Sequence, residues 1–496
     1  MAHSSLIGLS RFLLSGPVLF ALSCVYEAGV GRAEIPPPER LDRPYAVQVL
    51  RLAPDEAFGR DRSCVQVGPY GKVIVAKVRA GNQVRIYRND EPDPLSYSSV
   101  EYVEFSPTGH SAAYFGVVEG ALCFIRNGVL VGEKPYLVDP DWQSFRLAWN
   151  PKDDSVATVT WDRGRNGLIR REGIPTRLDC DEAFEPTFSP DGTSFAFIGR
   201  SGRKRFVVRG GVRVSELYDD VRSLKFTPDS RSVMFVARAG DTSFVVKDGS
   251  RVSRRYKGSA IMVLSPSGRS YALTITEQDG NQYVVKNDRR LGPVFDEVSW
   301  PVFAHERDVL VFHARLLDRR FMVVKDGKRI GGAYDALAGY GPAISHDGSV
   351  IAFRGILRQG AFYRGLVIRD GQCLYEETYR VHETEPPLRG AQPSVSADGL
   401  SIAYDVEGGK GRRRVVRDGQ YVGEEYDWVN NLTFSPDGRT LIFMAGSGGK
   451  SFYVCNGKRV CQEYTFVTPP VTSQDGAKVI FAGLSDNALY RNEIPW

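Results

Sequence analysis

Four aspartates recur at equivalent places along the chain and are the first candidates for binding chemistry. Each follows an aromatic residue, as in Tyr218-Asp219 and Tyr426-Asp427. The set comprises Asp219, Asp296, Asp335 and Asp427. Carboxylates repeated on one face could form a ring of hydrogen-bond acceptors for a sugar or a cation. The alternative is local, with each aspartate capping the backbone of its own loop, and we favour this second interpretation.

Short clusters of arginine form a second candidate site, in loops between predicted strands. The candidate residues are Arg203, Arg205, Arg319, Arg320, Arg412 and Arg413. Several such loops on one rim could bind an anionic polymer or an acidic protein. A solvated rim that keeps sheet edges from associating is the simpler interpretation. Aromatic residues do not interleave with these arginines, so we do not expect nucleic acid as a partner.

The familiar catalytic motifs are absent, including Gly-x-Ser-x-Gly, His-Glu-x-x-His and Cys-x-x-Cys. The segment Gly446–Ser451 ends like a phosphate-binding loop, but Met444 stands where that loop requires glycine, which favours a hairpin. His305 and His346 occupy the same turn position in adjacent repeats and could seat a metal ion, although a role in the turn is favoured. We therefore expect no catalytic residues, no metal and no cofactor.

The elements that position these residues come from an internal repeat. A turn motif, clearest in Phe188–Gly192 and Phe434–Gly438 (Phe-Ser-Pro-Asp-Gly), occurs in eleven copies that begin 38 to 51 residues apart. Proline presets φ, aspartate bonds nearby backbone and glycine takes the left-handed conformation, so the chain reverses. A second motif, as in Val245–Gly249 (Val-Val-Lys-Asp-Gly), keeps step with the first and predicts a primed hairpin turn.

Each unit of about forty residues thus predicts four short strands. The first strand ends at the turn motif, the second is apolar, the third ends at Asp-Gly, and the fourth carries the aromatic residue before the recurring aspartate. Four-stranded units of this length are the signature of propeller blades. The sequence predicts an all-β fold, a β-propeller of four-stranded blades with eleven repeats.

These units resemble the TolB-like, or WD-repeat-like, propeller repeat of bacterial envelope proteins, on the motifs Phe188–Gly192 and Phe434–Gly438. The resemblance covers nearly the whole chain after the leader. Tol-system members carry a separate α/β domain before the propeller, and the first blade here begins almost at the predicted leader cut, so a Tol-system role is not expected. Some TolB-like propellers are oligogalacturonate lyases with a histidine-based metal site, and this sequence lacks a dense histidine set.

The two ends of the chain complement each other. The segment Arg51–Phe58 matches a fourth strand, whereas the chain ends in Leu489–Glu493, which matches a third strand. We expect the N-terminal strand to complete the last blade and leave no free sheet edge. Ordinary propellers have about four to eight blades. We therefore favour two tandem rings, with blades 1–6 in residues 45–300 and blades 7–11 in residues 301–496, and one large ring as the alternative.

The N-terminus predicts export. Residues 1–33 read as a secretory signal peptide, with the single charge Arg11 before an apolar run and small residues before a cut at Glu34. The alternative is a lipid anchor at Cys24. No other stretch is long enough and apolar enough to span a bilayer. Six cysteines follow the signal, and because the hairpin register places Cys455 opposite Lys458, not Cys461, we expect all six to be buried or free.

Composition is that of a soluble globular protein, with 42% hydrophobic residues, 25% charged residues and a net charge of +5. The functional expectation is a non-enzymatic binding or scaffold protein in the periplasm or outside the cell, with a protein or polysaccharide partner. The alternative is a propeller enzyme, a lyase or glycoside-processing enzyme that acts on polysaccharide at an axial site.

Overall fold

The computed structural model describes residues 46–496 except 54–55, 59–63, 132–146, 162–166, 172–173, 177–179, 300, 381–389 and 486. Residues Leu41–Trp496 form one compact unit. Within the described residues the fold is all-β, and two 3-10 turns, η1 (Pro69–Gly71) and η3 (Gly409–Gly411), interrupt the strands. No helix of the described chain is long and apolar enough to cross a membrane. The predicted signal peptide lies outside the described residues.

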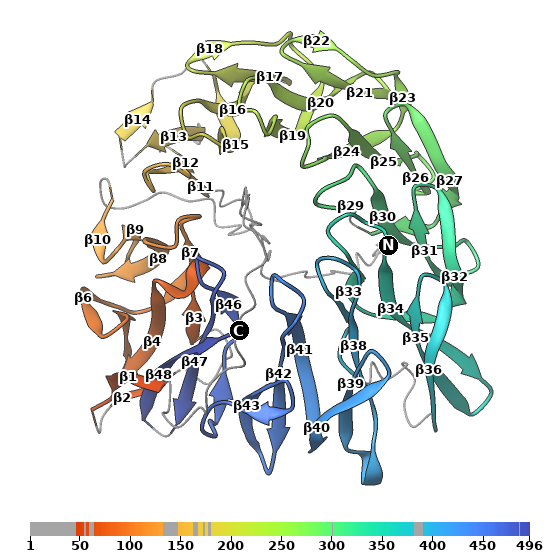
Figure 1. Cartoon of the computed structure of the whole chain (residues 1–496). Coiled ribbons are helices and arrows are strands. Elements are labelled where there is room, and N and C mark those ends of the chain that lie inside the picture. Colours follow the sequence, from red (N-terminus) through yellow and green to blue (C-terminus); the bar gives the residue numbers. More distant parts are fainter. Residues whose placement is uncertain are drawn as a thin grey trace, which may run out of the picture. The chain divides into compact units, whose positions relative to one another are not determined.

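The described strands form eleven antiparallel sheets, named A to K in this article (Figure 1). Sheet B contains β2 (Glu56–Phe58), β3 (Val65–Val67), β4 (Ile74–Ala80), β5 (Gln83–Arg88) and β6 (Glu91–Tyr97). Sheet C contains β7 (Val100–Phe105), β8 (Ala112–Val118), β9 (Ala121–Arg126) and β10 (Val129–Leu130). Sheet D contains β11 (Leu147–Trp149), β12 (Val156–Trp161), β13 (Gly167–Arg171) and β14 (Ile174–Thr176). Sheet E contains β15 (Glu182–Phe188), β16 (Phe195–Ser201), β17 (Lys204–Arg209) and β18 (Val212–Arg213).

The middle of the chain continues the same order of strands. Sheet F contains β19 (Asp220–Phe226), β20 (Val233–Ala239), β21 (Thr242–Lys247), β22 (Ser250–Arg251) and β23 (Tyr256–Lys257). Sheet G contains β24 (Ser259–Leu264), β25 (Tyr271–Thr276), β26 (Gln282–Lys286) and β27 (Arg289–Phe295). Sheet H contains β28 (Glu297–Val298), β29 (Val302–Phe303), β30 (Leu310–Arg315), β31 (Phe321–Lys325) and β32 (Lys328–Tyr334).

The last sheets complete the series, and the final one takes a strand from the N-terminus. Sheet I contains β33 (Ala336–Ile344), β34 (Ile351–Gln359), β35 (Phe362–Arg369) and β36 (Gln372–Arg380). Sheet J contains β37 (Ser394–Val395), β38 (Ile402–Glu407), β39 (Arg413–Arg417) and β40 (Gln420–Tyr426). Sheet K contains β41 (Trp428–Phe434), β42 (Leu441–Ser447), β43 (Lys450–Cys455) and β44 (Lys458–Arg459). Sheet A contains β45 (Phe466–Val467), β46 (Val471–Thr472), β47 (Lys478–Ser485), β48 (Ala488–Pro495) and β1 (Ala46–Arg51).

The Phe-Ser-Pro-Asp-Gly motif forms the turn between the first and second strands, as predicted. In sheet E the Ser189 hydroxyl accepts the N–H of Ser194 at 2.9 Å and donates to Asp191 at 2.5 Å. Gly192 has a φ of 70°, in the left-handed region that favours glycine. The same serine or threonine bonds to the aspartate two residues later in sheets F, I, J, K and A.

The Asp-Gly hairpins join the third and fourth strands, and their acidic or amide residue has a second function. The Asp248 carboxylate accepts the N–H of Val233 at 2.9 Å, at the start of the second strand of the same sheet. An aspartate or asparagine makes the equivalent bond in sheets B, C, G, H, I, J and K. This capping explains why Asp or Asn recurs at this position of the hairpin.

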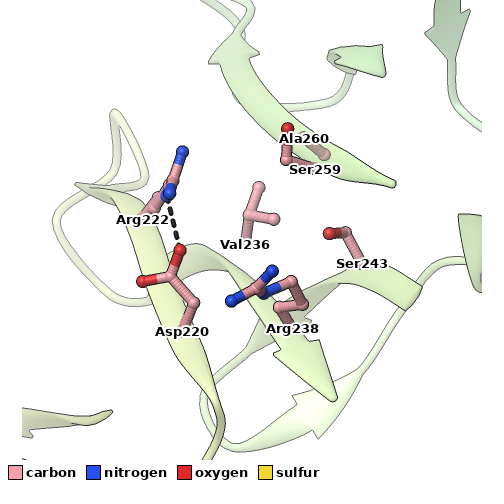
Figure 2. Close-up of a pocket in the computed structure, with 7 residues that line it drawn as sticks. All are labelled: Asp220, Arg222, Val236, Arg238, Ser243, Ser259 and Ala260. Carbon is pink, nitrogen blue, oxygen red and sulfur yellow. Dashed lines mark hydrogen bonds and ion pairs between the residues drawn. The ribbon is translucent and has the colours of Figure 1, made fainter. Parts of the chain in front are cut away.

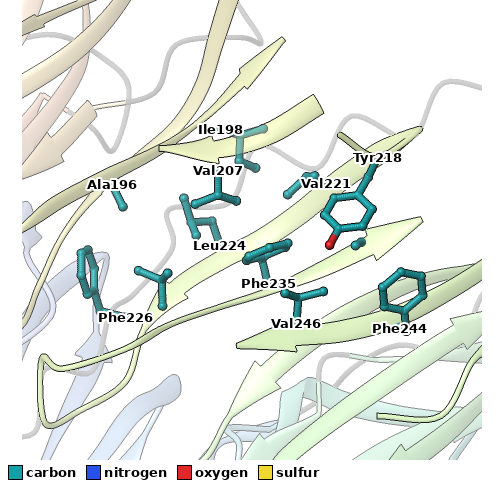
Figure 3. Packing of buried hydrophobic residues seen from close by; sticks show 12 residues of the cluster. Ala196, Ile198, Val207, Tyr218, Val221, Leu224, Phe226, Phe235, Phe244 and Val246 are labelled. Atoms are coloured by element: carbon teal, nitrogen blue, oxygen red, sulfur yellow. The ribbon is translucent and has the colours of Figure 1, made fainter. Parts of the chain in front are cut away.

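Neighbouring sheets pack through the apolar faces of their second and third strands. Figure 3 shows one such cluster, in which Ile198 and Val207 of sheet E meet Phe235 of sheet F. The aromatic residue that ends the fourth strand packs edge to face on the next sheet, as Tyr334 does on Phe353 with ring centroids 5.5 Å apart. Equivalent edge-on pairs join sheets B to C, G to H and J to K. Burial of these side chains supplies most of the driving force for docking.

A cation near the end of the third strand makes a second repeated contact between sheets. Arg209 donates to the carbonyl oxygen of Arg231 at 2.7 Å, in the turn motif of the next sheet. Equivalent bonds run from Arg126, Lys325, Arg369 and Arg417 to the next turn motif. The cation thus satisfies a turn carbonyl that its own sheet leaves free.

The N-terminal strand completes the last sheet, although with different bounds from those predicted. Strand β1 pairs antiparallel with β48, with Leu50 opposite Leu489 (Figure 1). The prediction of Arg51–Phe58 for this strand is wrong, because Glu56–Phe58 pairs with β4 in sheet B. Sheets A and B also share a hydrophobic cluster, which includes Leu484 and Val78.

The sheets on the two sides of residue 300 pack together in the same way. One hydrophobic cluster contains Val284 and Phe295 of sheet G together with Phe312 and Val324 of sheet H. The six cysteines that follow the predicted signal form no disulfide within the described chain, as expected. Cys455 faces Lys458 in the hairpin, and the Cys461 sulfur accepts the N–H of Tyr453 at 3.2 Å.

Candidate functional site

The four recurring aspartates lie in the linkers that lead into the first strand of the next sheet. The Asp219 carboxylate accepts the Lys204 ammonium at 2.6 Å and the N–H of Gly240 at 2.7 Å. Gly240 lies at the tip of the β20–β21 hairpin of sheet F. The hydrogen bond from Lys204, followed by the bond from Gly240, lowers the pKa of Asp219. This carboxylate therefore ties a linker to hairpins of both adjoining sheets.

The other three aspartates make related contacts with the sheet that follows them. Asp335 accepts the N–H of Arg358 at 2.6 Å, and Asp427 accepts the N–H of Gly448 at 2.8 Å. Asp296 instead pairs with the Arg315 guanidinium at 2.7 Å. These contacts match the local interpretation of the sequence for Asp219, Asp335 and Asp427, whose carboxylates cap hairpin backbone.

The hairpins between second and third strands lie on the same side of each sheet as these linkers. Arg205 illustrates this, since its guanidinium bonds Asp220 at 2.6 Å and stacks 4.7 Å from the Phe184 ring. Asp220, which the sequence did not single out, also accepts Arg222 at 2.5 Å. The motif search identified only its neighbour Asp219, because the aspartate after the aromatic residue is the one that recurs.

The predicted arginines differ in what they contact. Arg320 pairs with Asp318 at 2.7 Å, and Arg412 lies 3.6 Å from Asp427. Arg203 and Arg319 are exposed, and neither forms an ion pair with a described residue. Arg319 has a φ of 69°, so the tight turn holds its side chain at the hairpin tip. Only part of the basic rim is therefore free of intramolecular partners within the described chain.

Arg413 corrects one prediction, because it does not lie on the exposed rim. Its guanidinium is buried and bonds Asp405 at 2.6 Å and Glu377 at 3.1 Å. Arg354 bonds the same two carboxylates. These four residues are called the ion cluster below. Strand alternation explains the difference, since Arg412 and Arg414 flank Arg413 and side chains of successive residues point to opposite faces.

The ion cluster was missed by the motif search, although the sequence holds a signal for it. Arg354 and Asp405 each lie ten residues after the first residue of a turn motif, Ile344 and Val395. The equivalent position in sheets E and F is apolar, as Ile198 and Val236. An alignment of the repeats by strand register would have shown a charged residue at this core position in two consecutive repeats.

A small hollow lies on the hairpin side between sheets F and G (Figure 2). Its volume is about 10 Å³, about the room for one water molecule. Asp220 and Arg222 form an ion pair at its edge, and Arg238 lies beside Asp220 on the neighbouring strand (Figure 2). The remaining lining residues are Val236, Ser243, Ser259 and Ala260. The hollow is too small for a sugar or a nucleotide, so we place no ligand in it.

The remaining candidates from the sequence are the histidine pair and the glycine-rich segment. The rings of His305 and His346 stack with centroids 5.3 Å apart, and they belong to turns of adjacent sheets. Described histidine, cysteine, aspartate and glutamate side chains do not gather in groups of three or more that could hold a metal ion. The Gly446–Ser451 segment forms the β42–β43 hairpin, with Gly448 and Gly449 at positive φ, as the sequence analysis favoured.

No protein-family model matches the chain, and no curated protein matches it either. Solved structures do match. The Dos1 propeller has a TM-score of 0.29 and 10% identity, over 63% of this chain and 92% of that chain. The β-propeller domain of the Trilobed protease from Pyrococcus furiosus has a TM-score of 0.22 and 11% identity, over 75% and 98%. The WD40 domain of SCAP from fission yeast has a TM-score of 0.27 and 10% identity, over 82% and 97%. These structural neighbours are β-propeller proteins.

Proposed function

We propose that the chain is an extracytoplasmic, non-enzymatic binding or scaffold protein that uses its hairpin side to hold an acidic protein partner. The observation that carries the proposal is the set of side chains at the hairpin tips of sheets H and I. Leu317 is 64% exposed and Phe362 is 42% exposed. Arg319 lies in the same hairpin as Leu317.

One hydrogen bond and one electrostatic interaction support the idea that these two hairpins act together. The Asp335 linker lies between them in the chain and accepts a bond from Arg358 of the second hairpin. The bond from Asp318 raises the pKa of Arg320 in the first hairpin, and the charge of Asp335 adds to this shift. Exposed apolar and arginine side chains together are typical of the energetic centre of protein interfaces. An anionic polysaccharide is the alternative partner.

The test compares two double variants of equal charge. Arg203→Glu/Arg319→Glu changes the hairpin tips, and Arg231→Glu/Arg269→Glu changes exposed turn-motif residues at the opposite ends of the strands. The probes are immobilised polyglutamate and immobilised polygalacturonate, measured over a range of salt. We expect the hairpin variant to lose retention on polyglutamate and the turn variant to keep it. Equal losses in the two variants would contradict the proposal, and retention on polygalacturonate alone would favour the polysaccharide partner.

The enzymatic alternative makes a different prediction for the same polymer. A lyase or glycoside-processing enzyme would shorten polygalacturonate and generate new chain ends with time. We expect no turnover by the purified full-length chain. Turnover that is abolished by substitution of a residue of this chain would overturn the binding proposal in favour of the enzyme.

We also propose export, with residues 1–33 as the signal peptide and the periplasm or the exterior as the destination. The alternative is a lipid anchor on Cys24. The mass of the N-terminal peptide of protein recovered from cells distinguishes these two outcomes from retention of the leader. A mature chain that still begins at Met1 would contradict both.

We propose further that the eleven sheets form one closed ring, in preference to two tandem rings. Two observations support this. One hydrophobic cluster joins sheets G and H on the two sides of residue 300. Sheet A also packs on sheet B through a shared cluster and a cation-to-turn bond from Arg491 to Gly71. A single particle with one central opening in electron micrographs is the expected result, and two separate openings would contradict it.

A further inference from the structure

The first strand of sheet J is short in the described chain. Strand β37 contains only Ser394 and Val395, which pair with Ala403 and Ile402 of β38. In sheet F, by contrast, the first strand extends to Asp220, which pairs with Arg238 near the end of β20. After Ala403, no strand among the described residues pairs with β38 on this edge. An open edge leaves backbone groups unpaired and invites association with other chains.

Side chains of sheet I bond to backbone groups on this edge of β38. The Arg354 guanidinium of β34 donates to the Asp405 carbonyl oxygen at 2.7 Å. The Tyr375 hydroxyl of β36 accepts the N–H of Glu407 at 3.2 Å. Both backbone groups belong to β38, and a complete first strand would otherwise bond this edge. The neighbouring sheet thus covers an edge with which no described strand pairs.

Charge balance allows these groups to be buried. Arg354 bonds Glu377 at 2.8 Å and the Asp405 carboxylate at 2.9 Å. Arg413 bonds the same two acids at 3.1 Å and 2.6 Å. The side chains of Arg354 and Asp405 are 1% and 0% exposed. Two cations and two anions cancel, and each acid contacts both arginines, so the loss of one member leaves a buried charge without its full complement.

The ion cluster also contacts the described residues that precede β37. The N–H of Ala391 donates to the Asp405 carboxylate at 2.7 Å. Gly390 has a φ of 89°, and a Cβ there would lie 2.8 Å from the Arg354 guanidinium carbon, so only glycine lets the backbone approach. The Gln392 side-chain amide donates to the carbonyl oxygen of Gly341 in sheet I. Three consecutive residues, Gly390 to Gln392, are thereby fixed.

We propose that the ion cluster is a latch, which closes the open edge of sheet J and pins Gly390–Gln392 against sheets I and J. The described end of the Pro-containing insert, Gly390 to Gln392, lies against this cluster. In this latch the Asp405 carboxylate accepts hydrogen bonds at both of its oxygens, from the Ala391 N–H at one and from the Arg413 guanidinium at the other. Opening the latch releases Gly390 to Gln392 and exposes the edge of β38.

The peptide bond between Arg389 and Gly390 reports the state of the latch, because trypsin cleaves after arginine only where the following residues can be drawn out of the fold. The full-length chain and the variant Asp405→Asn are digested, and cleavage of this one bond is followed by mass spectrometry. The asparagine amide has only one oxygen that can accept hydrogen bonds, so it cannot bond both Ala391 and Arg413 as the carboxylate does. We therefore expect roughly tenfold faster cleavage in Asp405→Asn. The exposed edge should also increase self-association, measured by light scattering.

The matched control is Glu376→Gln, in the residue next to Glu377 on β36, whose exposed pair with Arg364 lies outside the ion cluster. It should be cleaved at the wild-type rate. If Asp405→Asn does not fold, Arg413→Lys takes its place, because lysine keeps the charge and loses the two-pronged geometry. A folded Asp405→Asn or Arg413→Lys that is cleaved no faster than wild type would overturn the latch, as would equally fast cleavage of Glu376→Gln.

Discussion

Arg491 donates a hydrogen bond to the carbonyl oxygen of Gly71, which stands 420 residues earlier in the chain. The same kind of bond joins Arg209 to Arg231 across only 22 residues. Arg491 lies on β48 in sheet A, and Gly71 belongs to the turn motif of sheet B. Contacts that link consecutive sheets along the chain thus also link the last sheet to the first, and strand β1 adds a backbone ladder to this junction.

The first prediction concerns the junction at β1. Leu50 is 8% exposed and packs in the cluster shared by sheets A and B, whereas Val47 on the same strand is 65% exposed. Leu50→Ala should lower the free energy of unfolding by about 2–5 kcal/mol. Val47→Ala is the control and should change it by less than about 0.5 kcal/mol. Urea denaturation measures both, and equal small effects would mean that β1 contributes little to the fold.

The second prediction compares two glycines at positive φ. A Cβ at Gly192 would lie 2.2 Å from the Asn150 side-chain oxygen, whereas a Cβ at Gly202 would meet nothing within 4 Å. Gly202→Ala should cost about 1–2 kcal/mol of stability from backbone strain alone. Gly192→Ala adds a clash with the preceding sheet and should cost about 1–3 kcal/mol more. Thermal unfolding of the two variants measures the difference, and identical midpoints would argue against tight contact between consecutive turns.

The third prediction concerns titration of the turn motif. Hydrogen bonds from the Ser189 hydroxyl and the Thr193 N–H lower the pKa of Asp191 to about 2. A lowered pKa means that the native carboxylate binds fewer protons than the unfolded one as pH falls below about 4, so acid weakens the turn. Ser189→Ala should raise this pKa towards the ordinary aspartate value. Carboxyl NMR shifts measure it, and an unchanged pKa would show that Ser189 is not its main determinant.

The repeat and its turn chemistry could be predicted from sequence because they depend on local rules. Gly192 and Asp248 act within a few residues or within one hairpin, so their spacing alone identifies them. The capping role of Asp219 was likewise one of two interpretations that the sequence allowed. In the structure, the Asp219 carboxylate accepts the N–H of Gly240, which lies 21 residues away in the next sheet.

The ion cluster could not be found from local rules because its members come from two sheets. Arg354 and Asp405 lie 51 residues apart, and the insert between them changes the spacing of the repeat. Arg413 belongs to a run of three arginines, and only the strand register decides which of them is buried. The bounds of β1 were misplaced for a similar reason, because Leu50 and Phe58 both suit a strand and only the pairing partners distinguish them.

The last prediction concerns His313, which lies on β30 at the position that Arg354 occupies in the next sheet. Burial lowers the pKa of His313 below its usual 6.5, and the charge of Glu297 opposes this shift only in part. The unfolded chain then binds more protons than the native chain as pH falls below about 6.5, so protonation destabilises the fold. His313→Gln should therefore lose less stability than wild type between about pH 7 and pH 5. The exposed His110→Gln serves as the control, and urea denaturation at each pH gives the comparison. Parallel stability curves for wild type and His313→Gln would show that His313 protonates as freely in the fold as in the unfolded chain.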